Sequence, residues 1–548
     1  MATMKSNLQK IEHVVVLMLE NRSFDNLLGW LKHPDDRGGQ KVNGVAGKDL
    51  KNPIPEYARP ADGTSFVSVS VGDPIDMTYP NPDPGEEYAH VNTQLFGSVN
   101  PEENRLSQHD AKPLKPYNLP DRMPKTAPMS GFVIDYVNHL NALNEKTPGK
   151  GMPSYEEYKI IMDCFPEEAV PVMSALAREY AVFDAWFASV PSQTLCNRSF
   201  MHAATSHGYV LNSTLIRWMM HTSPTIFSRI EKKQDPKVTW RIYYDRLDIL
   251  PLVGLQYPAL LKYRRSNLRT MEDFENDASV EGGLPSYSFI EPRFIIDHND
   301  QHPPVKGPTL FRTSSVLAGE QLIERIYNAL RNGPDWEKTL FIITFDEHGG
   351  CYDHVPPPVA VPPDPKKPKG EQDFKFDRLG VRVPTIMVSP YIKRGTVISE
   401  VHDHTSIIKF LCDRWGLKPL TGRDEAAINF HNVLNLKEPD LRKDFMLASR
   451  PYRATRGMLD EPINDLQKTI LFLLAALEDV LELIEERHLF DKVRDAVELF
   501  IDEKRVAHIK TVGQAISFTI SVDRRVTKHL SFFDWLKLRV KIALGIAP

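Results

Sequence analysis

The sequence predicts an α/β fold built around a mostly parallel β-sheet. Residues 11–19 form a short apolar run, rich in β-branched residues and without polar alternation, as is typical of a strand buried on both faces. Further along, helical patterns alternate with short apolar runs, which indicates parallel strands covered by helices. Ligand-type polar residues follow several of these runs, which is where such sheets carry their chemistry.

The individual elements follow from these patterns. Residues 22–30 open a helix directly after the first strand. A helix at 318–331 carries Leu322, Ile326 and Leu330 at i, i+4 spacing. The other expected elements are helices at 170–180 and 403–415 and strands at 181–190, 239–244, 287–290, 340–345 and 384–388.

The chain divides into two parts near residue 450. Residues 1–450 hold the sheet-forming pattern, whereas residues 451–548 are strongly helical, above all in 466–486 and 490–504. Within the first part, residues 31–128 are rich in Pro, Gly, Asn and Asp and show little periodicity, which predicts an irregular insertion. We therefore expect one large α/β domain followed by a C-terminal helical region.

Composition and charge exclude several classes of protein. With 67 basic and 72 acidic residues the net charge is −5, so there is no basic field for nucleic acid. The four cysteines form no CxxC pair, which argues against a zinc ribbon or a disulfide scaffold. The N-terminus lacks the shape of a signal peptide, and no apolar run approaches the ~20 residues of a membrane span. We expect a soluble protein, cytoplasmic or exported by a system independent of signal peptides.

Glu20 and Asn21 follow the first predicted strand. A carboxylate and an amide oxygen side by side can give two oxygen ligands to one cation. The same pair also suits a helix start, where Asn caps the backbone and acidic groups favour the positive end. This motif alone therefore leaves both interpretations open.

Asp346 and Glu347 follow the strand at 340–345, and His348, two glycines and Asp353-His354 come directly after them. Two adjacent carboxylates would repel each other if they were buried without a cation. An exposed acidic turn is the alternative, but the preceding strand directs the pair to the carboxyl edge of the sheet. The sequence thus predicts a metal site there.

The loop after residue 190 presents Ser192 and Thr194 next to Asn197 and Arg198. A hydroxyl oxygen bound to a divalent metal loses its proton more readily and becomes a competent nucleophile. Arg and Asn side chains can hold phosphate oxygens by hydrogen bonds. Hydroxyls are common in turns, so this loop is informative only together with the acidic motifs.

Histidines occur in three polar loops, as His109, His302 and His404. Imidazoles can bind phosphate, shuttle protons or ligate metals near neutral pH. Each of them alone is more often a surface or capping histidine, so they indicate a site only if the fold brings them together.

Five segments together resemble the bacterial and plant phosphoesterase family, which contains non-specific phospholipases C and a bacterial acid phosphatase. They span about residues 10–430 in the family's order: IEHVVVLMLENRSFDNLLGW, VPSQTLCNR, LPSYSFIEPR, FIITFDEHGGCYDHVPPP and HDHTSIIKFLCDRWGL. The resemblance implies an alkaline-phosphatase-like α/β sandwich, with residues 1–450 as the catalytic domain.

The resemblance also implies roles for particular positions. Thr194 matches the family's hydroxyl nucleophile, with Ser192 as the alternative, and His354 is the expected proton donor. Cys196 replaces a common proline, and Ser130 stands where members often carry an aspartate, so details of substrate binding differ. The implied metal ligands are Glu20, Asn21, Thr194, Asp346 and Glu347, and the expected substrate contacts are His109, Asn197, Arg198, His302 and His404.

The expected activity is that of a phospholipase C, which cleaves the glycerol–phosphate ester of phospholipids through a phosphorylated threonine. Zinc or another divalent ion is the expected cofactor. The alternatives are an acid phosphatase acting on phosphomonoesters and a lipid- or sugar-binding module without activity. The intact acidic set argues against the module, because a site without catalysis has no reason to bury like charges together.

Residues 531–547 read SFFDWLKLRVKIALGIA and place Trp535, Leu538 and Ile542 on one face of a helix. Cations on the remaining surface would let this helix lie in a membrane interface. The alternative is a terminal helix docked on the domain, which is the more usual role of an amphipathic helix in a globular protein.

We expect the docked helix, so deleting residues 530–548 should lower the melting temperature and reduce turnover of phospholipid vesicles and of a soluble aryl phosphodiester equally. Parallel assays on both substrates check this. A loss confined to vesicles would assign the segment to the membrane interface instead.

Overall fold

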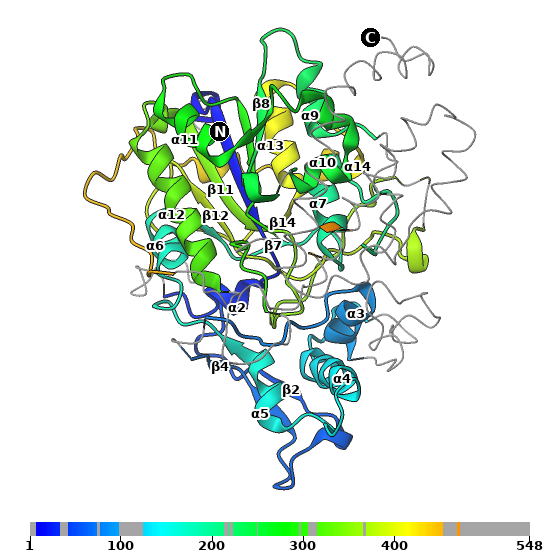
Figure 1. Ribbon diagram of the computed structural model, residues 1–548. Coiled ribbons are helices and arrows are strands. Elements are labelled where there is room, and N and C mark those ends of the chain that lie inside the picture. The colour runs from blue at the N-terminus through cyan, green and yellow to red at the C-terminus, as the bar shows by residue number, and fades with distance from the viewer. Residues whose placement is uncertain are drawn as a thin grey trace.

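An eight-stranded sheet organises the part of the chain that the computed structural model describes (Figure 1). The described residues are 7–32, 42–73, 77–97, 124–212, 218, 223–248, 250–294, 298–304, 315–364, 366, 369–452, 467, 470 and 471.

The central strand is β1 (His13–Leu19), which pairs in parallel with β10 (Tyr287–Ile290) on one side and β11 (Thr339–Phe345) on the other. Strand order is β13-β6-β12-β11-β1-β10-β8-β9. Only β12 (Thr385–Val388) runs antiparallel to its neighbours in this sheet, so the prediction of a mostly parallel sheet is confirmed. The outer strands are β6 (Ala181–Phe183), β8 (Trp240–Tyr244), β9 (Leu268–Thr270) and β13 (Thr396–Ile398).

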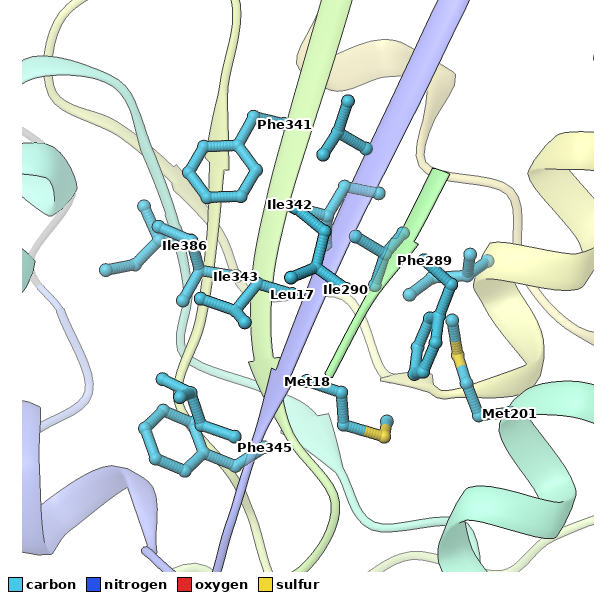
Figure 2. Close-up of a cluster of buried hydrophobic side chains, with 14 of the residues drawn as sticks. Leu17, Met18, Met201, Phe289, Ile290, Phe341, Ile342, Ile343, Phe345 and Ile386 are labelled. Atoms are coloured by element: carbon cyan, nitrogen blue, oxygen red, sulfur yellow. The ribbon is translucent and has the colours of Figure 1, made fainter. Parts of the chain in front are cut away.

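Apolar side chains of the central strands fill the interior. Every residue of β1 and β11 is buried, because an inner strand covered on both faces has no side open to solvent. Figure 2 shows Leu17 of β1 among residues of β11 such as Ile343, and Met201 of a covering helix beside Phe289 of β10. This packing fixes the directions in which the strand ends point.

Helices cover both faces of the sheet (Figure 1). The expected helices at 170–180, 318–331 and 403–415 are confirmed with small shifts in their ends. One face carries α6 (Pro171–Glu179), α11 (Met271–Ser279) and α12 (Val316–Asn332). The other carries α7 (Thr194–Ala203), α9 (Ile226–Glu231), α10 (Leu252–Gln256), α13 (Thr405–Trp415) and α14 (Gly422–Ala426).

The predicted strand at 181–190 is only partly right. β6 ends at Phe183, and a separate strand, β7 (Trp186–Phe187), pairs with β14 (His402–Asp403) outside the main sheet. Between them, the Asp184 carboxylate accepts a hydrogen bond from the backbone N–H of Asn43 at 2.8 Å. The polar residue thus breaks what reads as one apolar run.

Residues 31–128 are more regular than predicted. A helix, α3 (Tyr88–Phe96), packs on α4 (Phe132–Glu145), and β2 (Lys51–Pro53) pairs with β3 (Phe66–Ser68). Side chains of these elements form a second, smaller hydrophobic cluster. Its burial stabilises helices and strands that the weak periodicity of the sequence does not predict. The other short elements nearby are α2 (Phe24–Leu28), α5 (Tyr155–Tyr158), β4 (Ser70–Val71) and β5 (Asp163–Cys164).

Most of the predicted C-terminal region lies outside the described residues. This holds for the helix at 490–504, for the amphipathic segment 531–547 and, apart from residues 467, 470 and 471, for the helix at 466–486. The boundary near residue 450 therefore stays a prediction. In the described part of the chain no helix is long and apolar enough to cross a membrane.

Candidate active site

The carboxyl ends of β1 and β11 bring the two predicted acidic motifs together. The last residues of these strands pair in register, so Glu20-Asn21 and Asp346-Glu347 emerge side by side. The backbone N–H of Asn21 donates to Asp346 Oδ1 at 3.2 Å. The side chains of Glu20, Asp346 and Glu347 are fully buried. The four ligands predicted on these two motifs therefore share one enclosed place at the sheet edge.

Asn21 turns the chain at this place. Its φ of 57° lies in the left-handed region, which Asn tolerates better than most residues. Its Nδ2 donates to Glu86, and it lies 2.9 Å from His302 Nε2. Its Oδ1 is buried and has no hydrogen-bond partner.

Thr194 begins α7 and is the hydroxyl that the structure brings to the acidic group. Its Oγ1 donates to Glu20 Oε2 at 3.2 Å. The hydroxyl of Ser192 donates instead to the backbone carbonyl of Val210. Of the two candidate nucleophiles, only Thr194 thus contacts a predicted metal ligand.

Arg198 lies one helical turn after Thr194 and neutralises part of the acidic group. Its Nε donates to Glu20 Oε1 at 2.7 Å, and its Nη2 donates to the Met18 carbonyl at 3.0 Å. The Nε also lies 3.8 Å from Asp346 Oδ2. The guanidinium therefore holds one oxygen of Glu20 and leaves the other to Thr194. A direct contact between Arg198 and substrate stays a prediction.

The acidic group carries more negative charge than Arg198 balances. Burial raises the pKa of Glu20 well above its usual value, and Asp346 raises it further while Arg198 opposes the rise. Burial and then Asp346 likewise raise the pKa of Glu347. Such crowding of carboxyl groups is costly unless a cation or protons compensate it.

The available oxygens fit a divalent cation. Asn21 Oδ1, Asp346 Oδ2 and Glu347 Oε1 are all buried without a hydrogen-bond partner. Buried polar atoms almost always have a hydrogen-bond partner in folded proteins. Three unpartnered oxygens on residues that lie side by side in the fold therefore need an explanation. Carboxylate and amide oxygens are ligands that divalent cations accept, and a bound cation would satisfy all three.

A second group of possible metal ligands consists of Asp25, Asp353 and His354, whose ligand atoms lie within 4.8 Å of one another. Here a cation is already present, because Arg382 donates to Asp25 Oδ1 and to Asp353 Oδ1, each at 2.9 Å. The remaining carboxylate oxygens accept hydrogen bonds from the backbone of Asp25 and from His354. Burial acts to raise the pKa of Asp25, but Arg382 and His354 outweigh it and hold that pKa below its usual value. We therefore interpret this group as an ion-pair network.

The predicted proton donor, His354, belongs to this network. Its Nδ1 contacts Asp25, and its Nε2 lies 2.6 Å from Lys48 Nζ and 3.2 Å from Asn43 Oδ1. The structure thus gives His354 partners other than Thr194 and Glu20, and its role as proton donor stays a prediction.

Of the other predicted substrate contacts, one lies against a predicted ligand side chain and two bond to backbone atoms near the site. His302 contacts Asn21, whereas His404 Nε2 lies 2.7 Å from the backbone carbonyl of Asp346. The amide of Asn197 bonds only to backbone atoms of residues 190–193, so it holds the loop before Thr194. His109 lies outside the described residues. Substrate binding by these residues stays a prediction.

Sequence reasoning missed three residues around the site. Glu86 contacts Asn21, while His348 joins Glu347 to Gln94: its Nδ1 lies 3.3 Å from Glu347 Oε2 and its Nε2 lies 2.7 Å from Gln94 Oε1. Glu86 and Gln94 belong to the segment predicted to be irregular. The local signal that could have pointed to them is the Gly85-Glu86-Glu87 turn before an amphipathic stretch.

The fold and the site together are those of an α/β enzyme with an acidic, hydroxyl-bearing centre at the carboxyl edge of its sheet. Comparison with known proteins is specific: a model described as the phosphoesterase family matches residues 11–418. The chain therefore belongs to the phosphoesterase family and is a phosphoric ester hydrolase, as its motifs predict.

Curated relatives agree with this assignment. Non-specific phospholipase C6 of Arabidopsis thaliana is 34% identical over 495 residues, which cover 85% of this chain and 81% of that protein. Non-specific phospholipase C3 of the same plant is 34% identical over 464 residues, covering 79% and 75%. Phospholipase C B of Mycobacterium tuberculosis is 26% identical over 499 residues, covering 84% and 82%.

Among solved structures, a protein in the alkaline phosphatase superfamily from Vibrio parahaemolyticus aligns at 12% identity and a TM-score of 0.30, covering 47% of this chain and 64% of that chain. The α/β assignment rests on the strand order and directions described above.

Thr194→Ala should lower kcat by at least about 10³-fold, because it removes the attacking oxygen. Ser192→Ala should have a much smaller effect, since that hydroxyl bonds to a backbone carbonyl. Steady-state hydrolysis of a soluble phosphodiester, with metal content measured for each variant, checks the ranking. The reverse order would show that the nucleophile lies two residues earlier.

Arg382→Met should lower the free energy of unfolding at pH 7 by about 3–5 kcal/mol, because it leaves two buried carboxylates without their cation. Arg394→Met is the matched control: its ion pairs to Glu179 and Asp444 are partly exposed, and it should cost about 1 kcal/mol or less. Urea denaturation of both variants measures the difference. Equal destabilisation would contradict the special role of the Arg382 network.

Proposed function

We propose that this chain is a phospholipase C, which hydrolyses the glycerol–phosphate ester of phospholipids with Thr194 as nucleophile. The observation that carries the proposal is the contact of Thr194 Oγ1 with Glu20, inside a group whose neighbouring oxygens lack partners. Relatives named phospholipase C, at up to 34% identity over most of the chain, support the substrate class.

The residues that would hold a divalent cation are Glu20, Asn21, Thr194, Asp346 and Glu347. A cation bound there supplies positive charge that neutralises phosphate oxygens and lowers the pKa of a hydroxyl in contact with it. Zinc is the first candidate ion, and it accepts Asp and Glu oxygens. The ligand set contains only oxygens, however, which Mg²⁺, Ca²⁺ and Mn²⁺ also prefer, so metal analysis has to include all four.

The chain's own groups prepare the attack. The hydrogen bond from Thr194 to Glu20 Oε2 orients the hydroxyl, and Arg198 keeps Glu20 in place through its other oxygen. Thr194 Oγ1 gives up its proton, for which Glu20 Oε2 is the acceptor in contact, and forms a bond to phosphorus while the bond to the glycerol oxygen breaks. This produces diacylglycerol and a phosphorylated threonine, which water hydrolyses to release the phosphorylated head group.

The departing glycerol oxygen requires a proton. A histidine is the expected donor, and His354 is the candidate that the family resemblance indicates. The contact of its Nδ1 with Asp25 holds the imidazole ring in one orientation. We also propose that the protein contacts the phospholipid surface; a loss confined to vesicles on deletion of residues 530–548 would assign that contact to the segment 531–547.

The proposal is tested by hydrolysis of phosphatidylcholine and of an aryl phosphomonoester, coupled to metal analysis of the purified protein. We expect bound divalent metal and release of diacylglycerol and phosphocholine. Asp346→Ala should lose the metal and nearly all activity while its circular dichroism is unchanged, because one buried ligand is removed. Efficient hydrolysis of the monoester alone would make the protein a phosphatase. A fully active, metal-replete Asp346→Ala variant would overturn the site.

A further inference from the structure

We infer that Glu86 is a positioning residue of the active site: together with His302 it fixes the amide of Asn21 so that Oδ1 faces the cation position. This inference rests on the cation site in the proposed function. Glu86 is only 5% exposed and reaches the site from the turn before α3, in the segment 31–128 that the sequence predicts to be irregular.

The hydrogen bonds around His302 determine its tautomer. His302 Nδ1 lies 2.7 Å from the backbone carbonyl of Pro303, which can only accept, so Nδ1 carries the hydrogen. In the neutral ring, Nε2 is then an acceptor, and it lies 2.9 Å from Asn21 Nδ2. His302 Nε2 thus accepts a hydrogen bond from one of the two amide hydrogens of Asn21.

Glu86 accepts a hydrogen bond from the other amide hydrogen of Asn21. Its Oε2 accepts a hydrogen bond from Asn21 Nδ2. Since a carboxylate and an acceptor imidazole nitrogen both face the same amide atom, that atom has to be the NH₂ group and not the carbonyl oxygen. With both hydrogens engaged, the amide plane is fixed and Oδ1 points away from Glu86 and His302, where it is buried without a partner.

The alternative orientation would oppose cation binding. If the amide turned over by 180°, it would present N–H groups to the cation and its oxygen to the carboxylate of Glu86. Both changes are unfavourable. The first turns the partly positive N–H hydrogens toward the cation, and the second places two hydrogen-bond acceptors together. Glu86 therefore selects the orientation in which Asn21 is a ligand.

The turn that carries Glu86 is fixed by close packing and by a hydrogen bond to its backbone. A side chain at Gly85 would meet the ring of His90 at 2.0 Å, so the turn requires glycine there. The carbonyl of Gly85 accepts a hydrogen bond from Gln94 Nε2 at 2.8 Å, and Gln94 also contacts His348 beside Glu347. The position of Glu86 is thus tied to the same loop that carries the acidic pair.

The main rival is direct ligation by Glu86, because its Oε1, like Glu347 Oε1, is buried without a hydrogen-bond partner. The two roles predict different couplings. A positioning residue acts only through Asn21, so its contribution disappears when the amide is removed. A ligand contributes whether or not Asn21 is present.

The test measures divalent-cation affinity of the full chain, stripped of metal, by calorimetric titration with Zn²⁺ and Mn²⁺. Glu86→Ala should weaken binding by about 10–100-fold, as is typical when a partner that orients a ligand is lost. Glu86→Gln should weaken it less, since its side-chain oxygen can still accept from Asn21. Glu87→Ala, the adjacent acidic residue, is the control and should leave affinity unchanged within about twofold.

The decisive comparison is Glu86→Ala in an Asn21→Ala background. We expect no further loss of affinity there, with melting temperatures confirming that each variant is folded. An equal loss in both backgrounds would make Glu86 a ligand and overturn the positioning role while leaving the proposed function intact. If the unmodified chain binds neither ion, the cation site of the proposed function fails, and this inference fails with it.

Discussion

The parallel pairing of β1 with β11 is the constraint on which the site depends. Seven residues of β1 are paired in register with seven of β11, and each strand ends directly before its acidic motif. A slip of one residue would turn these side chains to the other face and separate the carboxylates. The apolar packing of the central strands, which opposes such a slip, therefore also sets the geometry of the chemistry.

The protein buries two clusters of carboxylates, and they differ in how far the protein's own groups compensate their charge. Asp25 and Asp353 share the guanidinium of Arg382, and each of their oxygens is bonded. Glu20, Asp346 and Glu347 share the single guanidinium of Arg198, and oxygens are left over. The hydrogen bonds of the first group are complete within the protein, whereas the second group leaves oxygens that a cation could satisfy. Distance alone would favour the first group as a metal site, although its oxygens are already bonded.

Much of the fold was predictable because the inner strands carry continuous apolar runs and α12 carries a clear helical period. The acidic motifs were predictable for the related reason that they follow those strands. The contributions of Glu86 and Gln94 were not, because they come from a segment without periodicity that is ordered by packing on α4. The roles of Asn197 and Arg198 were also hidden, since whether a polar side chain bonds to the backbone, to Glu20 or to substrate depends on tertiary contacts.

The distance along the chain between the two acidic motifs has a consequence for biosynthesis. Asn21 and Asp346 are 325 residues apart. At a translation rate of about 5–20 residues per second, the first strand leaves the ribosome on the order of 15–65 s before its central partner exists. During that time the apolar run of β1 has no β11 to pair with, and the ligands after it cannot assemble a cation site. A cation held by both motifs could therefore bind only at a late stage of synthesis, and the apolar N-terminal strand stays without its partner throughout the interval.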